Sequence, residues 1–182
     1  MDHDRSAGPQ GPDAESWARA LAGDADAFGR LYGRHAPMVH AVLISRVAAA
    51  DVDDLLQEVF VAAWRGLDGL REPARLGAWL ATIARRAAAR HLERSPPRPE
   101  PLPEVVDARA GEPDRRAEAD ELLRVLRELP EAYRETLALR VVEGLSGPEI
   151  AELTGLAPAS VRTNLSRGLA LLRERLARRG WS

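Results

Sequence analysis

Apolar residues recur along most of this chain at the three- and four-residue steps of an α-helix. The helical pattern covers residues 13–94, is interrupted over residues 95–113, and resumes over residues 114–182. No stretch shows the sustained apolar and polar alternation of a β-strand. We therefore expect an all-α protein with two small helical domains, whose boundaries are those of the two patterned stretches.

The interruption between the two stretches is rich in proline. Pro96, Pro97 and Pro99 begin a series that continues to Pro113. Proline lacks an amide donor and disfavours helix at the preceding residue, so residues 95–113 are expected to form a flexible, extended linker. Residues 1–12 contain glycines, prolines and few large apolar groups, which predicts a disordered tail.

Polar residues and proline mark expected helix starts in residues 13–94. Asp24 can cap a helix that carries Phe28 and Leu31 on one face. Pro37 should kink that helix or begin the next one. Asp51 can cap a further helix. The apolar stripe expected to face inward on that helix consists of Val52, Leu55, Leu56, Val59, Phe60 and Trp64.

The segment after residue 145 predicts a helix-turn-helix. Ser146 and Glu149 have the spacing of a capping box, and Gly155 can adopt the positive φ that a tight turn between two helices needs. The second helix, from Pro158 to about Arg178, should bury Val161, Leu165, Leu169 and Leu172. The polar and cationic side chains expected off that stripe, where a recognition helix meets base edges, are Ser160, Arg162, Thr163, Asn164, Ser166 and Arg167.

The net charge of −2 hides a strong segregation of charge. Residues 1–60 carry −5, residues 61–98 carry +5, residues 99–154 carry −7 and residues 155–182 carry +5. Two basic blocks are consistent with two surfaces that bind an anion such as DNA, although solvated helix faces could give the same pattern. Every basic residue is arginine, a side chain suited to bidentate contacts with phosphate and guanine, although a GC-rich genome would also favour arginine.

Three segments resemble conserved regions of bacterial sigma factors. The acidic amphipathic segment Asp51–Trp64 resembles the second conserved region, and Trp79–Leu92 resembles the helix of that region that melts and reads the minus-ten element. The segment Leu126–Glu174 resembles the fourth conserved region, which reads the minus-thirty-five element. Their order, and the proline-rich joint between them, resemble the small extracytoplasmic-function (ECF) group, so the resemblance implies a region 2 domain at 13–94 and a region 4 domain at 114–182.

The resemblance also implies roles for individual residues. The helix that docks on core RNA polymerase, through its beta and beta-prime subunits, would do so with Asp53, Asp54, Gln57 and Glu58. Minus-ten DNA would be held by Arg71, Arg75, Trp79, Arg85, Arg86 and Arg90. Minus-thirty-five DNA would be read by Ser160, Arg162, Thr163, Asn164 and Arg167.

Two departures from the family pattern affect these roles. The loop 70–77 lacks the aromatic residues with which relatives capture a flipped base, so the residues that would hold the base beside Trp79 stay open. Asn164 stands where relatives usually carry a cation. Because asparagine can pair bidentately with adenine, we hypothesise an adenine preference at the base that it faces.

The composition excludes several other functions. The chain has no cysteine, which removes disulfides, thiolate metal sites and a cysteine nucleophile. No histidine spacing predicts a metal site, and no base, nucleophile or phosphate-binding loop accompanies the acidic residues, so we expect no cofactor and no enzyme. The absence of a signal peptide pattern or a long apolar run predicts a cytoplasmic protein without membrane insertion. The resemblance to sigma factors implies that it is associated with the nucleoid through RNA polymerase.

Two alternatives remain open at this point. A stand-alone helix-turn-helix regulator would use the N-terminal domain for dimerisation on a palindromic site. A degenerate sigma-like protein would bind polymerase without opening DNA. For the sigma factor itself, the resemblance implies core RNA polymerase, promoter DNA and an anti-sigma factor as partners.

Overall fold

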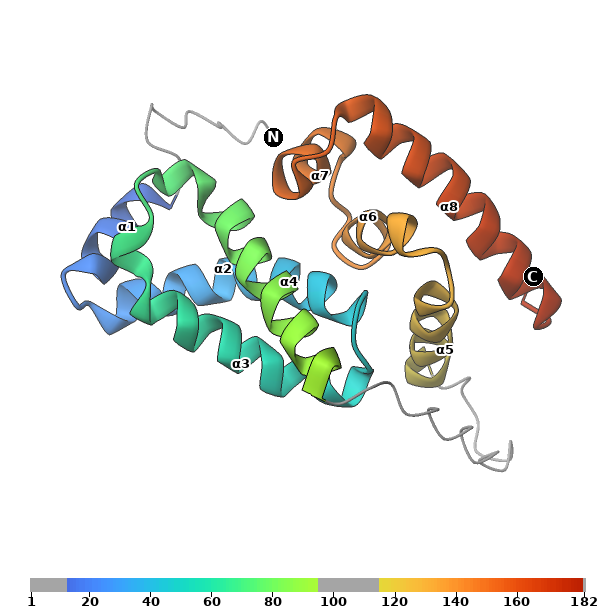
Figure 1. Cartoon of the computed structure of the whole chain (residues 1–182), viewed down its shortest axis with the longest axis horizontal. Helices are drawn as coiled ribbons and strands as arrows, with labels where there is room; N and C mark the ends of the chain where they lie inside the picture. The colour runs from blue at the N-terminus through green and yellow to red at the C-terminus, as the bar shows by residue number, and fades with distance from the viewer. Residues whose placement is uncertain (1–12, 95–114, 182) are drawn as a thin grey trace.

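The computed structural model describes residues 13–94 and 115–181. Within these ranges it contains eight α-helices, two short 3-10 helices and no strand, which confirms the all-α prediction (Figure 1). The predicted tail at 1–12 and the predicted linker at 95–113 lie outside the described residues, so both stay predictions.

The N-terminal half is a packed group of helices. Its elements are α1 (Ala14–Leu21), α2 (Ala25–Ile44), α3 (Ala49–Arg65), η1 (Leu67–Gly69), η2 (Pro73–Arg75) and α4 (Leu76–Arg94). The helices α2, α3 and α4 pack against one another and α1 lies on α2. Their shared core includes Leu43, Val52 and Leu80, each of which is almost completely buried.

The predicted helix starts in this half had mixed outcomes. The carboxylate of Asp24 caps α2 as predicted, because its Oδ1 accepts from the backbone N–H of Ala27 at 2.9 Å. Pro37 lies inside the continuous helix α2 and begins no helix. The prediction that Asp51 caps a helix was wrong: Ala48 occupies the N-cap of α3, and Asp51 instead pairs with His91 at the end of α4, at 3.2 Å.

Trp64 was predicted to face inward, but 40% of its surface is exposed. At 100° per residue it lies about 120° around the helix from Val52, beyond the edge of the buried stripe. Ala63, which is fully buried, occupies the inward position instead. The ring of Trp64 packs edge-on against Phe28 of α2, with 4.7 Å between ring centroids.

The C-terminal half consists of α5 (Arg115–Arg127), α6 (Glu131–Val141), α7 (Gly147–Thr154) and α8 (Pro158–Arg178). Helix α6 lies at its centre and packs against the other three. The approach of α8 to α6 is close at Gly168, where a Cβ atom would lie only 2.8 Å from Cδ1 of the buried Leu137. A glycine at this position therefore allows the two helices to meet.

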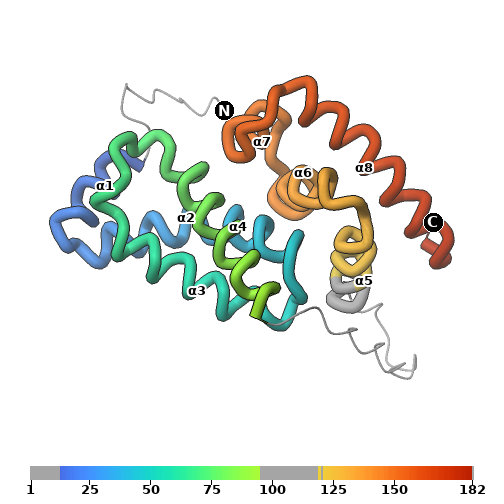
Figure 2. The backbone as a smooth tube through the Cα atoms, viewed as in Figure 1, coloured from blue at the N-terminus to red at the C-terminus, as the bar shows by residue number. Residues whose placement is uncertain are grey.

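The two halves pack directly on each other. Helix α6 lies on α2, and α7 lies on the N-terminal part of α4 (Figure 2). At this second contact Gly77 of α4 faces Leu153 of α7, because a Cβ on Gly77 would lie 3.0 Å from Leu153 Cδ2. The expected recognition helix α8 lies on the far side of α6 from α2 (Figure 1).

Candidate nucleic-acid interface

The predicted helix-turn-helix is present, and its local signals act as expected. The N–H of Ser146 donates to Glu149 Oε2 at 2.8 Å and the N–H of Glu149 reaches Ser146 Oγ at 3.5 Å, which completes the capping box of α7. Gly155 ends α7 with a φ of +71°, in the left-handed region that glycine adopts without strain. Pro158 lies in the first turn of α8, where its missing amide has no helical partner to lose.

Helix α8 buries one face and presents the other to solvent. Val161 and Leu172 are buried, and Leu165 and Leu169 pack against the same core. Four of the side chains predicted to read the minus-thirty-five element are exposed, namely Ser160, Arg162, Thr163 and Arg167. Arg162 and Arg167 form no ion pair within the described residues. The structure therefore brings the predicted reading residues together on one accessible face.

Asn164 lies differently from its neighbours on α8. It is half-buried, and its Nδ2 donates to the backbone carbonyl of Ala132 in α6 at 2.9 Å. One amide hydrogen is thus engaged within the protein, which leaves the second hydrogen and Oδ1 for any contact with a base. The adenine preference stays a prediction.

The four predicted polymerase-binding side chains lie together on the exposed face of α3. Asp53 and Gln57 are one helical turn apart, as are Asp54 and Glu58, and all four are exposed. Glu58 also pairs with Arg90 of α4, with 3.0 Å between Oε1 and Nη2. Both partners of this pair are largely exposed, so it contributes little to stability.

The sequence interpretation missed an apolar extension of this acidic face. Val61 and Trp64 are 49% and 40% exposed, and they follow Gln57 and Glu58 along the same side of α3. Tyr32 of α2 lies nearby and packs on Phe60, with 4.5 Å between ring centroids. The position of Trp64 around the helix, about 120° from Val52 and at the border of the apolar stripe, could have indicated this exposed apolar patch from the sequence.

The candidate minus-ten residues occupy α4 and the loop before it. Arg71, Arg75, Arg86 and Arg90 are exposed, and Arg75 pairs locally with Glu72 at 2.7 Å. Trp79 is half-buried and packs on the core. Its ring lies beside Gly66, because a Cβ atom built on Gly66 would lie 3.7 Å from Cζ2 of Trp79.

Arg85 differs from the other candidate minus-ten arginines because an acidic residue of the other half of the molecule holds it. Its Nη2 and Nε donate to Glu135 Oε1 at 2.7 and 3.0 Å, and Nη2 also donates to the carbonyl of Leu153 at 3.0 Å. The second oxygen of Glu135 accepts from Nη2 of Arg46, in the turn after α2, at 2.7 Å. In this arrangement, Arg85 does not face solvent as a free phosphate-binding group.

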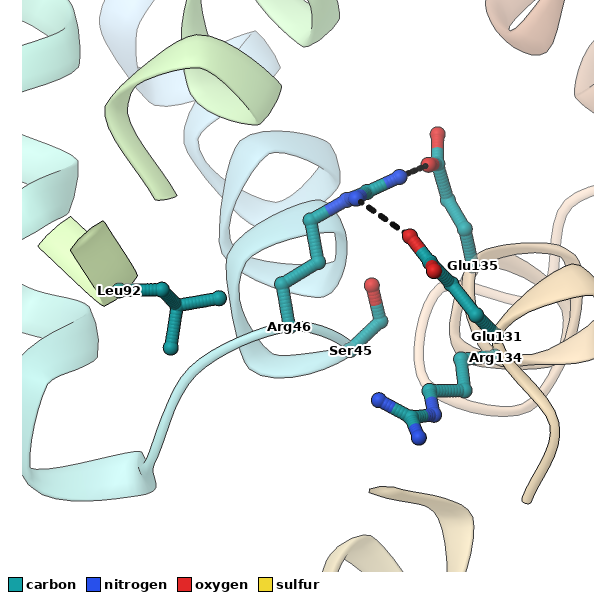
Figure 3. A pocket seen from close by; sticks show the side chains of 6 residues that line it. All are labelled: Ser45, Arg46, Leu92, Glu131, Arg134 and Glu135. Atoms are coloured by element: carbon teal, nitrogen blue, oxygen red, sulfur yellow. Dashed lines mark hydrogen bonds and ion pairs between the residues drawn. The ribbon is translucent and has the colours of Figure 1, made fainter. Parts of the chain in front are cut away.

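Glu135 is charged in this environment. Its side chain is only 12% exposed, and burial by itself would raise the pKa. The hydrogen bonds and positive charges of Arg85 and Arg46 outweigh burial and hold the pKa of Glu135 below its ordinary value. A polar cavity beside this group is lined by Ser45, Arg46, Leu92, Glu131, Arg134 and Glu135 (Figure 3).

The described residues contain neither a candidate metal site nor a candidate membrane-spanning helix. No three histidine, aspartate or glutamate side chains there are grouped closely enough to hold a metal ion. None of the described helices combines the length and hydrophobicity needed to cross a bilayer.

The sequence and fold match known proteins over both halves. The family "Sigma-70 region 2" matches residues 31–95, and "Sigma-70, region 4" matches residues 119–172. The ECF RNA polymerase sigma factor BldN of Streptomyces coelicolor is 36% identical over 157 residues, which are 80% of this chain and 58% of BldN. The chain thus spans less than two thirds of that relative.

Two other relatives are matched over almost their whole length. The RNA polymerase sigma factor CarQ of Myxococcus xanthus is 35% identical over 167 residues, which cover 85% of this chain and 91% of CarQ. The structure of CnrH, solved in complex with the cytosolic domain of CnrY, superposes with a TM-score of 0.68 at 30% identity, over 91% of this chain and 97% of CnrH. The chain therefore belongs to the sigma-70 family, in its ECF group of RNA polymerase sigma factors.

Proposed function

We propose that this protein directs core RNA polymerase to specific promoters, with three surfaces that divide the work. The acidic face of α3 docks on polymerase, the arginines and Trp79 of α4 hold the melted minus-ten region, and the exposed face of α8 reads the minus-thirty-five element. The observation that carries the proposal is that one chain presents both a helix-turn-helix and a separate acidic helix face.

The polymerase contact is supported by charge and by apolar surface together. Asp53, Asp54 and Glu58 can set register and on-rate against a basic surface. Val61 and Trp64 lie at the end of the same face, and a solvent-exposed tryptophan there is the kind of side chain that anchors a protein interface. We infer that both parts of the face are covered when polymerase binds.

The DNA contacts are supported by exposed arginines at two places. Arg86 and Arg90 on α4 can neutralise phosphates near the melted region, and each such contact makes binding salt-dependent. Trp79 is the candidate for stacking on an extruded base, which costs a few kcal/mol of unstacking. On α8, Arg162 and Arg167 flank Thr163 and Asn164, so phosphate and base contacts can alternate along the helix.

The partners follow from this assignment. They are core RNA polymerase, promoter DNA and an anti-sigma factor that sequesters the protein; the related CnrH, solved with the cytosolic domain of CnrY, supports a protein partner of that kind. Acting through polymerase, the protein would be found in the cytoplasm, associated with the nucleoid.

The test is multi-round transcription with core RNA polymerase from the host, with and without this protein, on its own upstream promoter. We expect new, specific transcripts that disappear in the double variant Asp54→Lys and Glu58→Lys. The control is the reversal of Glu174, an exposed acid whose ion-pair partner in the described part of the chain is Arg178 on its own helix, and it should preserve transcription.

The same assay separates the alternatives. Absence of transcripts together with sequence-specific DNA binding by the free protein would favour a stand-alone regulator, and dimers on a palindromic site would strengthen that result. Binding to polymerase without opening of DNA would favour a degenerate sigma-like protein. The family matches in both halves favour the sigma factor over the stand-alone regulator.

A further inference from the structure

The contact between the two halves of the molecule includes apolar packing at Gly77 and Leu153 and a cluster of opposite charges. Glu131, Glu135 and Glu143 of the C-terminal half face Arg46, Arg85 and His40 of the N-terminal half. Glu135 lies at the centre, where it binds both α4 and the turn after α2 at once. This interface therefore holds the two halves in one defined orientation.

The same contact occupies an arginine that the proposed function assigns to DNA. Both oxygens of Glu135 and the carbonyl of Leu153 accept from Nε and Nη2 of Arg85, which retains only 25% exposure. A carboxylate in this position makes the contacts that a phosphate group would make. Promoter DNA can therefore bind Nε and Nη2 of Arg85 only if Glu135 withdraws.

The closed arrangement also prevents the two DNA-reading surfaces from acting together. The minus-ten and minus-thirty-five elements are about 25 base pairs apart, or about 85 Å at 3.4 Å per base pair. A compact chain of this length has a radius of gyration of about 16 Å. With α6 and α7 packed on α2 and α4, the docked molecule is too compact to reach both promoter elements at once.

The closed arrangement is also separable. Burying the charge of Glu135 is costly and is offset only by its two arginine partners, so the net free energy of such a cluster is small compared with its individual contacts. The Nε of Arg46 is buried without an acceptor in the described part of the chain, which further weakens the docked form. A polar cavity of about 150 Å³ lies beside the cluster, so packing there is incomplete (Figure 3).

We propose that Glu135 is an intramolecular latch that competes with promoter phosphate for Arg85 and keeps the free protein in a closed form that cannot bind DNA productively. The proposal rests on the proposed function, because it regulates the minus-ten surface assigned there. Polymerase and DNA then bind the fraction of molecules in which the latch is open, and apparent affinity falls in proportion to that fraction.

The first test measures the distance between the two halves in the free protein, without DNA or polymerase. The chain has no cysteine, so cysteines introduced at the exposed positions Ala50 and Ala132, which flank the ion pair between Arg46 and Glu131, can carry spin labels uniquely. We expect one short distance population in the labelled parent. Glu135→Gln should move a substantial fraction of the molecules to longer distances. Arg46→Gln, which removes the second ion pair of Glu135 and leaves Arg85 in place, should do the same.

The matched control is Glu174→Gln. It makes the same change of charge in the same half of the molecule, but its ion-pair partner among the described residues, Arg178, is on its own helix. It should leave the distance distribution unchanged. If Glu135→Gln and Arg46→Gln, both folded by circular dichroism, show the parent's distribution as well, the latch does not exist.

The second test asks whether the latch covers a phosphate-binding group. The probe is a fluorescein-labelled single-stranded DNA of about 20 nucleotides and mixed sequence, because a phosphate contact is independent of sequence. Glu135→Gln should bind it about tenfold more tightly than the parent or Glu174→Gln, and the log–log salt slope should steepen by about one. Adding Arg85→Ala should abolish that gain.

Failure of the latch and failure of the proposed function give different results. If Glu135→Gln opens the molecule and gains affinity while no polymerase-dependent transcript appears, the latch stands and the promoter role fails. If transcription occurs as proposed while Glu135→Gln changes neither distance nor DNA affinity, the promoter role stands and the latch is refuted.

Discussion

Replacing Gly168 by alanine should destabilise the C-terminal half, whereas the same replacement at Gly33 should stabilise the protein. The new Cβ at Gly168 would lie 2.8 Å from Leu137 Cδ1 and 3.1 Å from both Leu137 Cγ and Tyr133 Cβ. Leu137 is fully buried, so it has no solvent into which to turn away. Gly33 lies in α2, and a Cβ there would meet nothing within 4 Å.

The magnitudes follow from two opposing effects. Overpacking a core costs about 1–3 kcal/mol, and three simultaneous short contacts place Gly168 in the upper half of that range. Alanine in a helix gains about 1 kcal/mol over glycine. Gly168→Ala should therefore lose about 1–2 kcal/mol net, whereas Gly33→Ala should gain up to about 1 kcal/mol because only the helical preference acts there.

Calorimetric unfolding measures both effects with the same substitution. In a domain of this size 1 kcal/mol shifts Tm by about 4–8 °C, so Gly168→Ala should lower the transition of the C-terminal half by about 4–16 °C. Gly33→Ala should raise the transition of the N-terminal half. A Tm for Gly168→Ala equal to or above that of the parent would refute the close approach of α8 to α6 on which the position of the recognition helix depends.

Three further outcomes are expected. Ser146→Ala removes the side-chain cap of α7 and should cost about 1 kcal/mol in the same calorimetric experiment. Arg90→Ala should reduce the log–log salt slope of promoter binding by the polymerase complex by about one, and an unchanged slope would remove Arg90 from the contacts. Acid should separate the two halves, because the pKa of Glu135 is lower in the docked form than its ordinary value of 4.5. The contribution of Glu135 to docking is therefore complete above pH 4.5 and is lost as the pH falls through the lower pKa of the docked form. Glu143 has the opposite effect, because burial raises its pKa and its protonation therefore favours docking. Distances between the labels that lengthen well above pH 4.5 would contradict the conclusion that Glu135 controls the separation.

The features that local sequence determines were predicted correctly. Ser146 and Glu149 are three residues apart and cap the same helix, and Gly155 sits at the turn that follows. Each of these depends on backbone geometry within a few residues, so a short sequence window contains all the information. The exposed face of α8 could be predicted for the same reason, because helical periodicity separates Val161 from Arg162 and Thr163.

The features that depend on neighbouring elements were predicted less well. Asp51 has a capping side chain, but the backbone enters the helix two residues earlier, at Ala49, and the carboxylate meets His91 from the end of α4 instead. Trp64 is apolar and near the stripe, but whether its edge of α3 is covered depends on what α2 places there. Neither outcome is present in the spacing of residues along one helix.

The charge pattern shows most clearly what sequence alone leaves open. Residues 61–98 and 155–182 were interpreted as two basic surfaces for an anion, with acidic residues between them. In the fold, the acidic stretch supplies Glu135 to the basic stretch, 50 residues away in sequence, so one of the expected DNA contacts is neutralised within the molecule. The exposed Arg162 and Arg167 near the start of α8 have no acidic partner among the described residues, and their helix lies on the other side of α6. Near the end of α8, by contrast, Arg175, Arg178 and Arg179 are each paired with a glutamate. The two basic blocks are therefore expected to differ in function: the arginines at the start of α8 are available for DNA at once, whereas the block on α4 becomes fully available only when the two halves of the protein separate.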